Sequence, residues 1–172
     1  MDSGRVCTTS KIKQLRDSRH THISYSPLPP PRRSLAKVAE YIAALGERAP
    51  TEFVLYTKEF VDELCHPDND PPQRKALMIA EQPRVLAIPW MNAMLAAMAE
   101  MIAERAGIPV PDWANEPERF LPEPLVFGYS PQSQAMAIEL TPAAFARRNL
   151  FCGQITLYTN RWEIVRQRRS TG

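Results

Sequence analysis

The stretch from Pro89 to Ala106 constrains the fold more than any other part of the chain. Its apolar residues recur at helical spacing, alanines fill most of the gaps between them, and Gly107 follows as a stop signal. The larger apolar residues of this stretch are Met91, Met94, Leu95, Met98, Met101 and Ile102. A helix that is apolar on almost every side has to be surrounded by other elements. We therefore predict a mainly α-helical domain with this helix at its centre.

Two shorter helices are predicted earlier in the chain. The first follows Ser34, whose side chain can cap a helix N-terminus, and ends at Gly46. The second begins near Thr51 and carries a stripe of apolar residues on one face. Because residues 53–57 are rich in β-forming side chains, a short strand there is the main alternative.

A third helix is predicted between a pair of prolines and Pro83. Proline is tolerated in the first turn of a helix, so Pro71 or Pro72 can begin this one, whereas Pro83 cannot continue it. The residues of this helix that we expect to be buried are Ala76, Leu77, Ile79 and Ala80.

Residues 108–133 combine frequent prolines with large apolar side chains. The prolines preclude a long regular element, but a disordered linker would not carry residues such as Trp113 and Phe120. We therefore predict an ordered loop that wraps the helices, with one short helical turn near 113–114.

The region that follows is predicted to contain only short elements. Residues 135–140 could form a short strand or a helical turn. Thr141 followed by Pro142 is a typical start for a short helix, which would run to Arg148. A second short strand is possible at 154–158. The expected fold is thus mainly α, with about five helices, a proline-rich wrapping loop and possibly two short C-terminal strands.

Charge divides the chain into three parts. Residues 1–33 carry seven Lys or Arg against two Asp, and residues 161–172 carry four Arg against one Glu. Residues 34–160 carry ten Lys or Arg against sixteen Asp or Glu. Because residues 1–33 lack apolar periodicity, they are predicted to be a disordered tail. We expect a single helical domain over 34–160 between two basic tails, which could attract nucleic acid.

The three cysteines of the chain are far apart and form no CxxC pair. An odd number of distant cysteines is more typical of free thiols in a reducing cytosol than of a disulfide framework. The N-terminal residues lack the apolar stretch of a secretory signal, and no apolar run reaches the length of a membrane span. We therefore expect a cytoplasmic protein without a membrane segment.

Few residues suggest chemistry. His20 and His22 form an HxH pair, but a metal site needs further ligands fixed in space. Cys65 stands beside His66, yet neighbouring residues on a helix point in different directions, so Cys65 is expected to be a small core residue at a helix end. Glycine-rich phosphate loops and the common zinc and serine hydrolase motifs do not occur in the sequence. We expect no enzyme activity, metal or cofactor.

Two features of the central helix have a functional and a structural interpretation. Glu100 and Glu104 lie one turn apart and could act as an acid–base pair, but we favour a solvent-facing side of the helix. The methionine stripe could be an adaptable binding face, but methionine at helical spacing more often belongs to the core. We therefore assign both features to the scaffold.

Three motifs in the second half of the chain are uncommon as a set. They are PxPxW at 109–113, PxRFL at 117–121 and PxxFxRRNLF at 142–151. With them, residues 50–160 resemble the C-terminal domain of a group of bacterial proteins labelled as helix-turn-helix regulators. Some members of this group are found beside nucleotidyltransferase-like toxins, so the resemblance implies an antitoxin-like protein.

The resemblance implies a partner-binding function, because residues 1–33 show no DNA-reading helices. The expected partner is a protein, namely a toxin encoded nearby. The candidate partner-binding residues are Trp113, Arg119, Phe120, Arg147, Arg148, Asn149 and Phe151. The alternative is a nucleic-acid-associated transcriptional regulator that uses its basic termini, with Arg166, Arg168 and Arg169 as candidate contacts.

Overall fold

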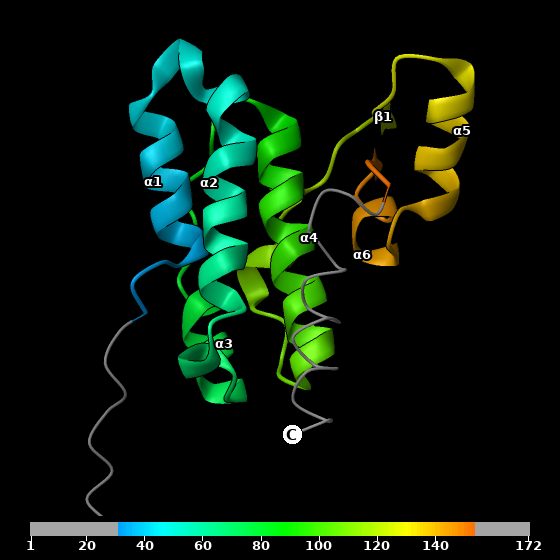
Figure 1. Ribbon diagram of the computed structural model, residues 1–172. Helices are drawn as coiled ribbons and strands as arrows, with labels where there is room; N and C mark the ends of the chain where they lie inside the picture. Colours follow the sequence, from blue (N-terminus) through cyan, green and yellow to red (C-terminus); the bar gives the residue numbers. More distant parts are fainter. Residues whose placement is uncertain (1–30, 154–172) are drawn as a thin grey trace, which may run out of the picture.

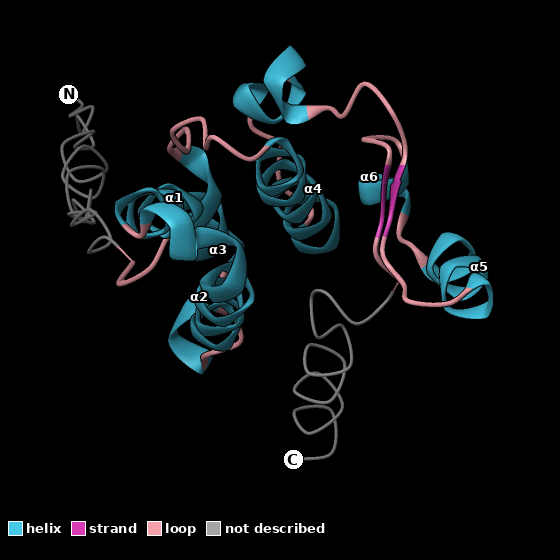
Figure 2. Ribbon diagram, turned by 90° about the horizontal axis from the view of Figure 1, so that it is seen from above, coloured by secondary structure: helices cyan, strands magenta, loops and turns pink. Residues whose placement is uncertain are grey.

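The first half of the molecule is a group of four α-helices. The structure is a computed structural model and describes residues 31–153. Helix α1 packs on α2, and α3 packs on α4 (Figure 1). The helices are α1 (Leu35–Ala44), α2 (Ala49–Leu64), α3 (Pro72–Ala80) and α4 (Pro89–Ala106). Seen from above, α4 lies between the α1–α3 group and the elements that follow it (Figure 2).

The second half consists of α5 and several elements of two to four residues. Two single-turn 3-10 helices lie against α4, and the two strands form one small parallel sheet in which Leu125 pairs with Leu150. These elements are the 3-10 helices Asp112–Asn115 and Pro117–Arg119, β1 (Leu125–Val126), α5 (Pro131–Leu140), α6 (Ala143–Ala146) and β2 (Leu150–Phe151). The mainly α-helical fold predicted from the sequence is confirmed, with six α-helices among the described residues.

Helix α4 is the centre of the fold, as its sequence predicts. Every residue from Met91 to Ala103 is buried. The helix begins at Pro89 and ends where Gly107 adopts a left-handed conformation with φ of 65°, which glycine reaches without steric penalty. The methionine stripe is therefore part of the core.

Helices α1 and α2 follow their apolar periodicity. The Ser34 hydroxyl accepts a hydrogen bond from the Lys37 backbone N–H at 3.3 Å, as expected of an N-cap. Helix α2 begins at Ala49, two residues before the predicted start, and the strand alternative over 53–57 is wrong. Phe53 and Thr57 lie one turn apart on the buried face, so tertiary packing overrides local β propensity.

The buried face of α3 differs from the prediction. Lys75, Met78 and Ile79 are buried, whereas Leu77 and Ala80 are exposed and Ala76 is half-buried. Lys75 can be buried because its ammonium group donates to the Asp70 carbonyl oxygen at 2.6 Å and to the Asp70 carboxylate at 3.3 Å. The aliphatic part of Lys75 can therefore pack inside while its ammonium group keeps its hydrogen bonds. This explains why the buried face of α3 includes Lys75.

The wrapping loop is confirmed and contains more structure than expected. It includes both 3-10 helices and β1, and Trp113 and Ala114 are buried in the predicted helical turn. Residues 135–140 are helical rather than extended, because they continue α5, which begins with a capping box between Ser130 and Ser133. The possible strand at 154–158 lies outside the described residues.

Helix α6 is shorter than predicted and ends at Ala146. Pro142 occupies its N-cap position, so Thr141 does not cap it. The Thr141 hydroxyl instead donates to the Ala137 carbonyl oxygen and accepts from the backbone N–H groups of Cys152 and Gly153, at 2.9 and 2.8 Å. Thr141 thus connects the end of α5 to the chain after β2.

Within residues 31–153, no helix is long and apolar enough to cross a membrane.

Candidate functional site

Arg148 forms an ion pair with Glu100 inside the protein. Its Nη1 donates to the Glu100 carboxylate and to the Ala144 carbonyl oxygen, and its Nη2 donates to the Ala114 carbonyl oxygen at 2.8 Å. Both side chains are almost fully buried. Burial lowers the pKa of Arg148, and the hydrogen bond to Glu100 opposes that shift. The prediction that Glu100 faces solvent is therefore wrong.

The neighbouring Arg147 reaches the same carboxylate from the surface. Its Nη2 lies 2.5 Å from the Glu100 Oε2 atom and 3.1 Å from the Asn115 Oδ1 atom, and its side chain is 47% exposed. Glu100 therefore receives one buried and one exposed guanidinium. Glu104, one turn further along α4, is exposed. The two carboxylates do not share a site, so the geometry offers no acid–base pair.

Arg119 is a second buried arginine, held near the other end of α4. Its Nη2 donates to the Pro83 carbonyl oxygen at 2.5 Å, and its guanidinium lies over the Trp113 ring at 5.2 Å. Burial lowers the pKa of Arg119 as well. Asn92 supports this end by bonding the backbone N–H and carbonyl of Leu86, each at 2.8 Å. Arg119 thus ties the wrapping loop to the segment between α3 and α4.

The other predicted partner-binding residues take part in the same internal framework. Trp113 is buried, and its indole N–H donates to the Ile79 carbonyl oxygen at 3.0 Å. Phe120 lies under the Arg148 guanidinium at 5.1 Å. Asn149 has φ of 58°, and its side-chain amide donates to the Leu121 carbonyl oxygen at 2.8 Å. Phe151 is half-buried in β2.

The seven candidate residues are therefore brought together, but mainly by contacts within the molecule. Arg147 is the exposed member; Trp113, Arg119 and Arg148 are buried, and the remaining three are half-buried. Their partner-binding function stays a prediction. Because the three motifs hold the wrapping loop and the segment around α6 against α4, they have a clear role in stabilising the fold.

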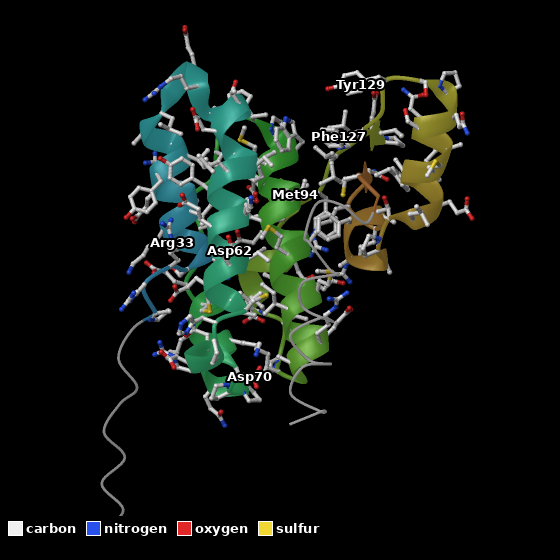
Figure 3. All side chains as sticks on the ribbon, viewed as in Figure 1. Arg33, Asp62, Asp70, Met94, Phe127 and Tyr129 are labelled. Atoms are coloured by element: carbon white, nitrogen blue, oxygen red, sulfur yellow. The ribbon has the colours of Figure 1, made fainter. Side chains whose placement is uncertain are left out.

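A groove of about 520 Å³ opens between the helical group and the elements around α5. Met94, on α4, and Phe127, after β1, both line it and are labelled in Figure 3. Trp90 packs against both Phe53 and Phe127 in edge-to-face geometry. The distances between the ring centroids are 5.0 Å to Phe53 and 5.7 Å to Phe127. The residues that line the groove are Phe53, Val54, Thr57, Trp90, Met94, Phe127, Gly128, Ser133, Met136, Ala137, Leu140, Cys152 and Gly153.

Several apolar side chains of the groove are open to solvent. Val54 is 58% exposed, Met136 52%, Phe127 40% and Leu140 39%. A single exposed apolar residue is ordinary, but a contiguous set around one concave surface marks a binding site. Sequence reasoning missed this groove. The apolar residues of α5 were visible as a signal, but the position of α5 relative to α2 was not.

The groove contains little polar chemistry. The Thr57 hydroxyl already donates to the Phe53 and Val54 carbonyl oxygens, at 2.9 and 3.0 Å. The Ser133 hydroxyl is engaged in the capping box of α5. A small polar ligand would therefore find few groups in the groove to orient it. An apolar ligand does not depend on such polar groups.

Cys65 and His66 do not form an activated pair in the structure. Burial raises the pKa of the Cys65 thiol, opposite to the shift that activates a nucleophile. His66 Nδ1 accepts a hydrogen bond from the Asp68 backbone N–H at 3.3 Å and caps the short 3-10 turn after α2. Cys65 packs half-buried against the core, as expected. Across residues 31–153, no three potential ligands gather into a metal-binding group.

Several candidates fall beyond the described part of the chain. His20, His22 and the three arginines Arg166, Arg168 and Arg169 lie outside residues 31–153. Whether the histidine pair holds a metal and whether the arginines contact nucleic acid therefore stay at the level of sequence prediction. Comparison of the chain with protein-family models, curated proteins and solved structures gives no match.

Proposed function

We propose that this is a non-enzymatic, antitoxin-like protein that binds an apolar segment of a partner protein in the groove between α2, α4 and α5. The observation that carries the proposal is the contiguous set of exposed apolar side chains around a concave surface. Helix-in-groove recognition uses this combination of a long apolar surface and few polar anchors.

The chemistry of the walls supports a protein partner over a small molecule. The groove is flanked by helices on both sides, and its hydroxyl groups are already engaged within the protein. Trp90 and Phe127 provide large aromatic surfaces, which are frequent anchors at protein interfaces. The resemblance described above suggests the first partner to test, a nucleotidyltransferase-like toxin encoded nearby.

Two pairs of variants test whether this groove binds the partner. Met136 and Ile138 lie on α5 and are equally exposed, at 52%, but only Met136 lines the groove. Val54 and Leu55 are neighbours on α2, exposed by 58% and 49%, and only Val54 lines the groove. Each pair therefore places the same charge inside and outside the groove.

The measurement is the affinity for the co-expressed toxin, by calorimetry after co-purification. Met136→Glu and Val54→Glu should weaken binding by about thirtyfold or more, because a charge would be buried against apolar surface. Ile138→Glu and Leu55→Glu should leave it within about threefold, as expected for residues outside an interface. Equal binding by all four variants would assign the partner to another surface, and no binding by the unmodified chain would reject the toxin as partner.

A further inference from the structure

The chain leaves the described part of the molecule from the edge of the groove. Cys152 and Gly153 line the groove and are the last described residues. Their backbone N–H groups are held by the Thr141 hydroxyl, and Gly153 has φ of 67°. This left-handed conformation is accessible to glycine and redirects the chain. Gly153 is therefore held at a fixed point on the groove wall.

The sequence that follows has an apolar pattern suited to such a surface. Residues 154–165 contain Ile155, Tyr158, Trp162 and Val165, at spacings of three, four and three. In a helix, this spacing would place the four side chains on one face and Leu157 and Ile164 on the opposite face. A segment with apolar residues on two faces suits a position between two apolar walls.

The length of the segment also fits. Twelve helical residues would span about 18 Å, close to the roughly 15 Å of the ten-residue helix α5 that forms one wall. Because the segment is attached directly to Gly153, its effective concentration at the groove is of millimolar order, far above that of a second copy at ordinary protein concentrations. Attachment therefore favours the chain's own segment as the occupant.

We propose that residues 154–165 dock in the groove of the free chain, with the Ile155–Tyr158–Trp162–Val165 face against the apolar wall. The segment covers the exposed side chains of Val54, Phe127 and Met136. If the groove is also the partner site, which rests on the function proposed above, the partner competes with this segment and displaces it.

The first test uses Cys152 as a reporter in the full-length chain. Cys152 lines the groove, whereas Cys65 lies at the end of α2 and serves as an internal reference. The rate of alkylation at each cysteine is measured by peptide mass spectrometry. Trp162→Glu should accelerate alkylation of Cys152 by about tenfold or more, because undocking exposes the groove. Thr156→Glu, a matched charge on the side of the segment that carries Thr159 and Glu163, should leave the rate within about twofold.

An unchanged Cys65 rate shows that the fold is intact in both variants. If Trp162→Glu leaves the Cys152 rate unchanged, the segment does not cover the groove and the proposal is overturned. Equal acceleration by both variants also overturns it, because the assigned apolar face would then have no special role.

A second test identifies the occupant directly. The photoreactive residue benzoylphenylalanine replaces Trp162 in the full-length chain, and the crosslinked peptides are sequenced. We expect crosslinks within one chain, to peptides of α2 or α5. Crosslinks between chains would assign the groove to a second copy, and crosslinks away from it would also overturn the proposal. Failure of the toxin to bind while the intrachain crosslink persists would reject the proposed function alone.

Discussion

Helices α4 and α5 are both rich in alanine and large apolar residues, but their environments are opposite. Helix α4 buries thirteen of its eighteen residues, whereas Ala137 is the single buried residue among the ten of α5. Met98 on α4 has no exposed surface, while Met136 on α5 is 52% exposed. Apolar composition is therefore the basis of the core in one helix and of an open groove wall in the other.

The difference follows from what packs against each helix. Helix α4 is covered by α3, by α6 and by both 3-10 helices of the wrapping loop, whereas α5 packs mainly on β1. The buried ion pair of Glu100 and Arg148 links α4 to the residues after α6, which continue into β2, the strand paired with β1. The position of the groove thus depends on how the segment around α6 is held against α4.

The largest effect is expected when that link is broken. Arg148→Ala leaves the Glu100 carboxylate and two carbonyl oxygens without their buried guanidinium, so we expect a loss of about 3–5 kcal/mol of unfolding free energy. The measurement is urea denaturation followed by circular dichroism. Arg147→Ala is the matched control, because Arg147 reaches the same carboxylate from the solvent and should contribute less than about 1 kcal/mol. Similar losses from both variants would mean that burial does not determine how much each arginine contributes to the free energy of unfolding.

The contrast between the two helices can be measured with one substitution made twice. Met98→Ala opens a cavity in the core and should cost about 2–5 kcal/mol. Met136→Ala removes an exposed side chain and should change stability by no more than about 0.5 kcal/mol. Denaturant midpoints at a constant slope give both values. A large loss from Met136→Ala would show that α5 is more tightly packed than its exposure indicates.

The extent of sequence prediction also differs between the two regions. Helix α4 follows from its own residues, because apolar periodicity bounded by Pro89 and Gly107 is a local signal. The burial of Glu100 does not, since it depends on Arg148, which is 48 residues away along the chain. The groove is equally non-local, because Val54 and Met136 come to line one surface only through the tertiary fold. Thus the core could be predicted from one segment, whereas the candidate site required the packing of several.

A smaller effect is expected from a single hydrogen bond that closes the wrapping loop. Trp113→Phe keeps an aromatic ring in place but leaves the buried Ile79 carbonyl oxygen without its indole donor. An unsatisfied buried acceptor costs about 1–3 kcal/mol, so the variant should unfold at a lower urea concentration without losing its helical signal. If its stability equals that of the unmodified chain, the loop is held by packing and by Arg119 rather than by this bond.

The smallest effect concerns Cys65, at the C-terminal end of α2 in the helical region. Because burial raises the pKa of its thiol, the neutral form persists to higher pH in the folded state than in the unfolded chain. The resulting stability is present below the ordinary pKa of a thiol, about 8.5, and is lost as the pH rises toward the folded value. Alkylation of Cys65 in the folded chain should therefore be slower than that of a model thiol at neutral pH, and its rate should rise at a higher pH than that of the unfolded chain in urea. The rate profile from pH 7 to pH 10 measures both effects. A folded-state profile displaced to lower pH would indicate an activated thiol and would make Cys65 a reactive site within the otherwise structural helical region.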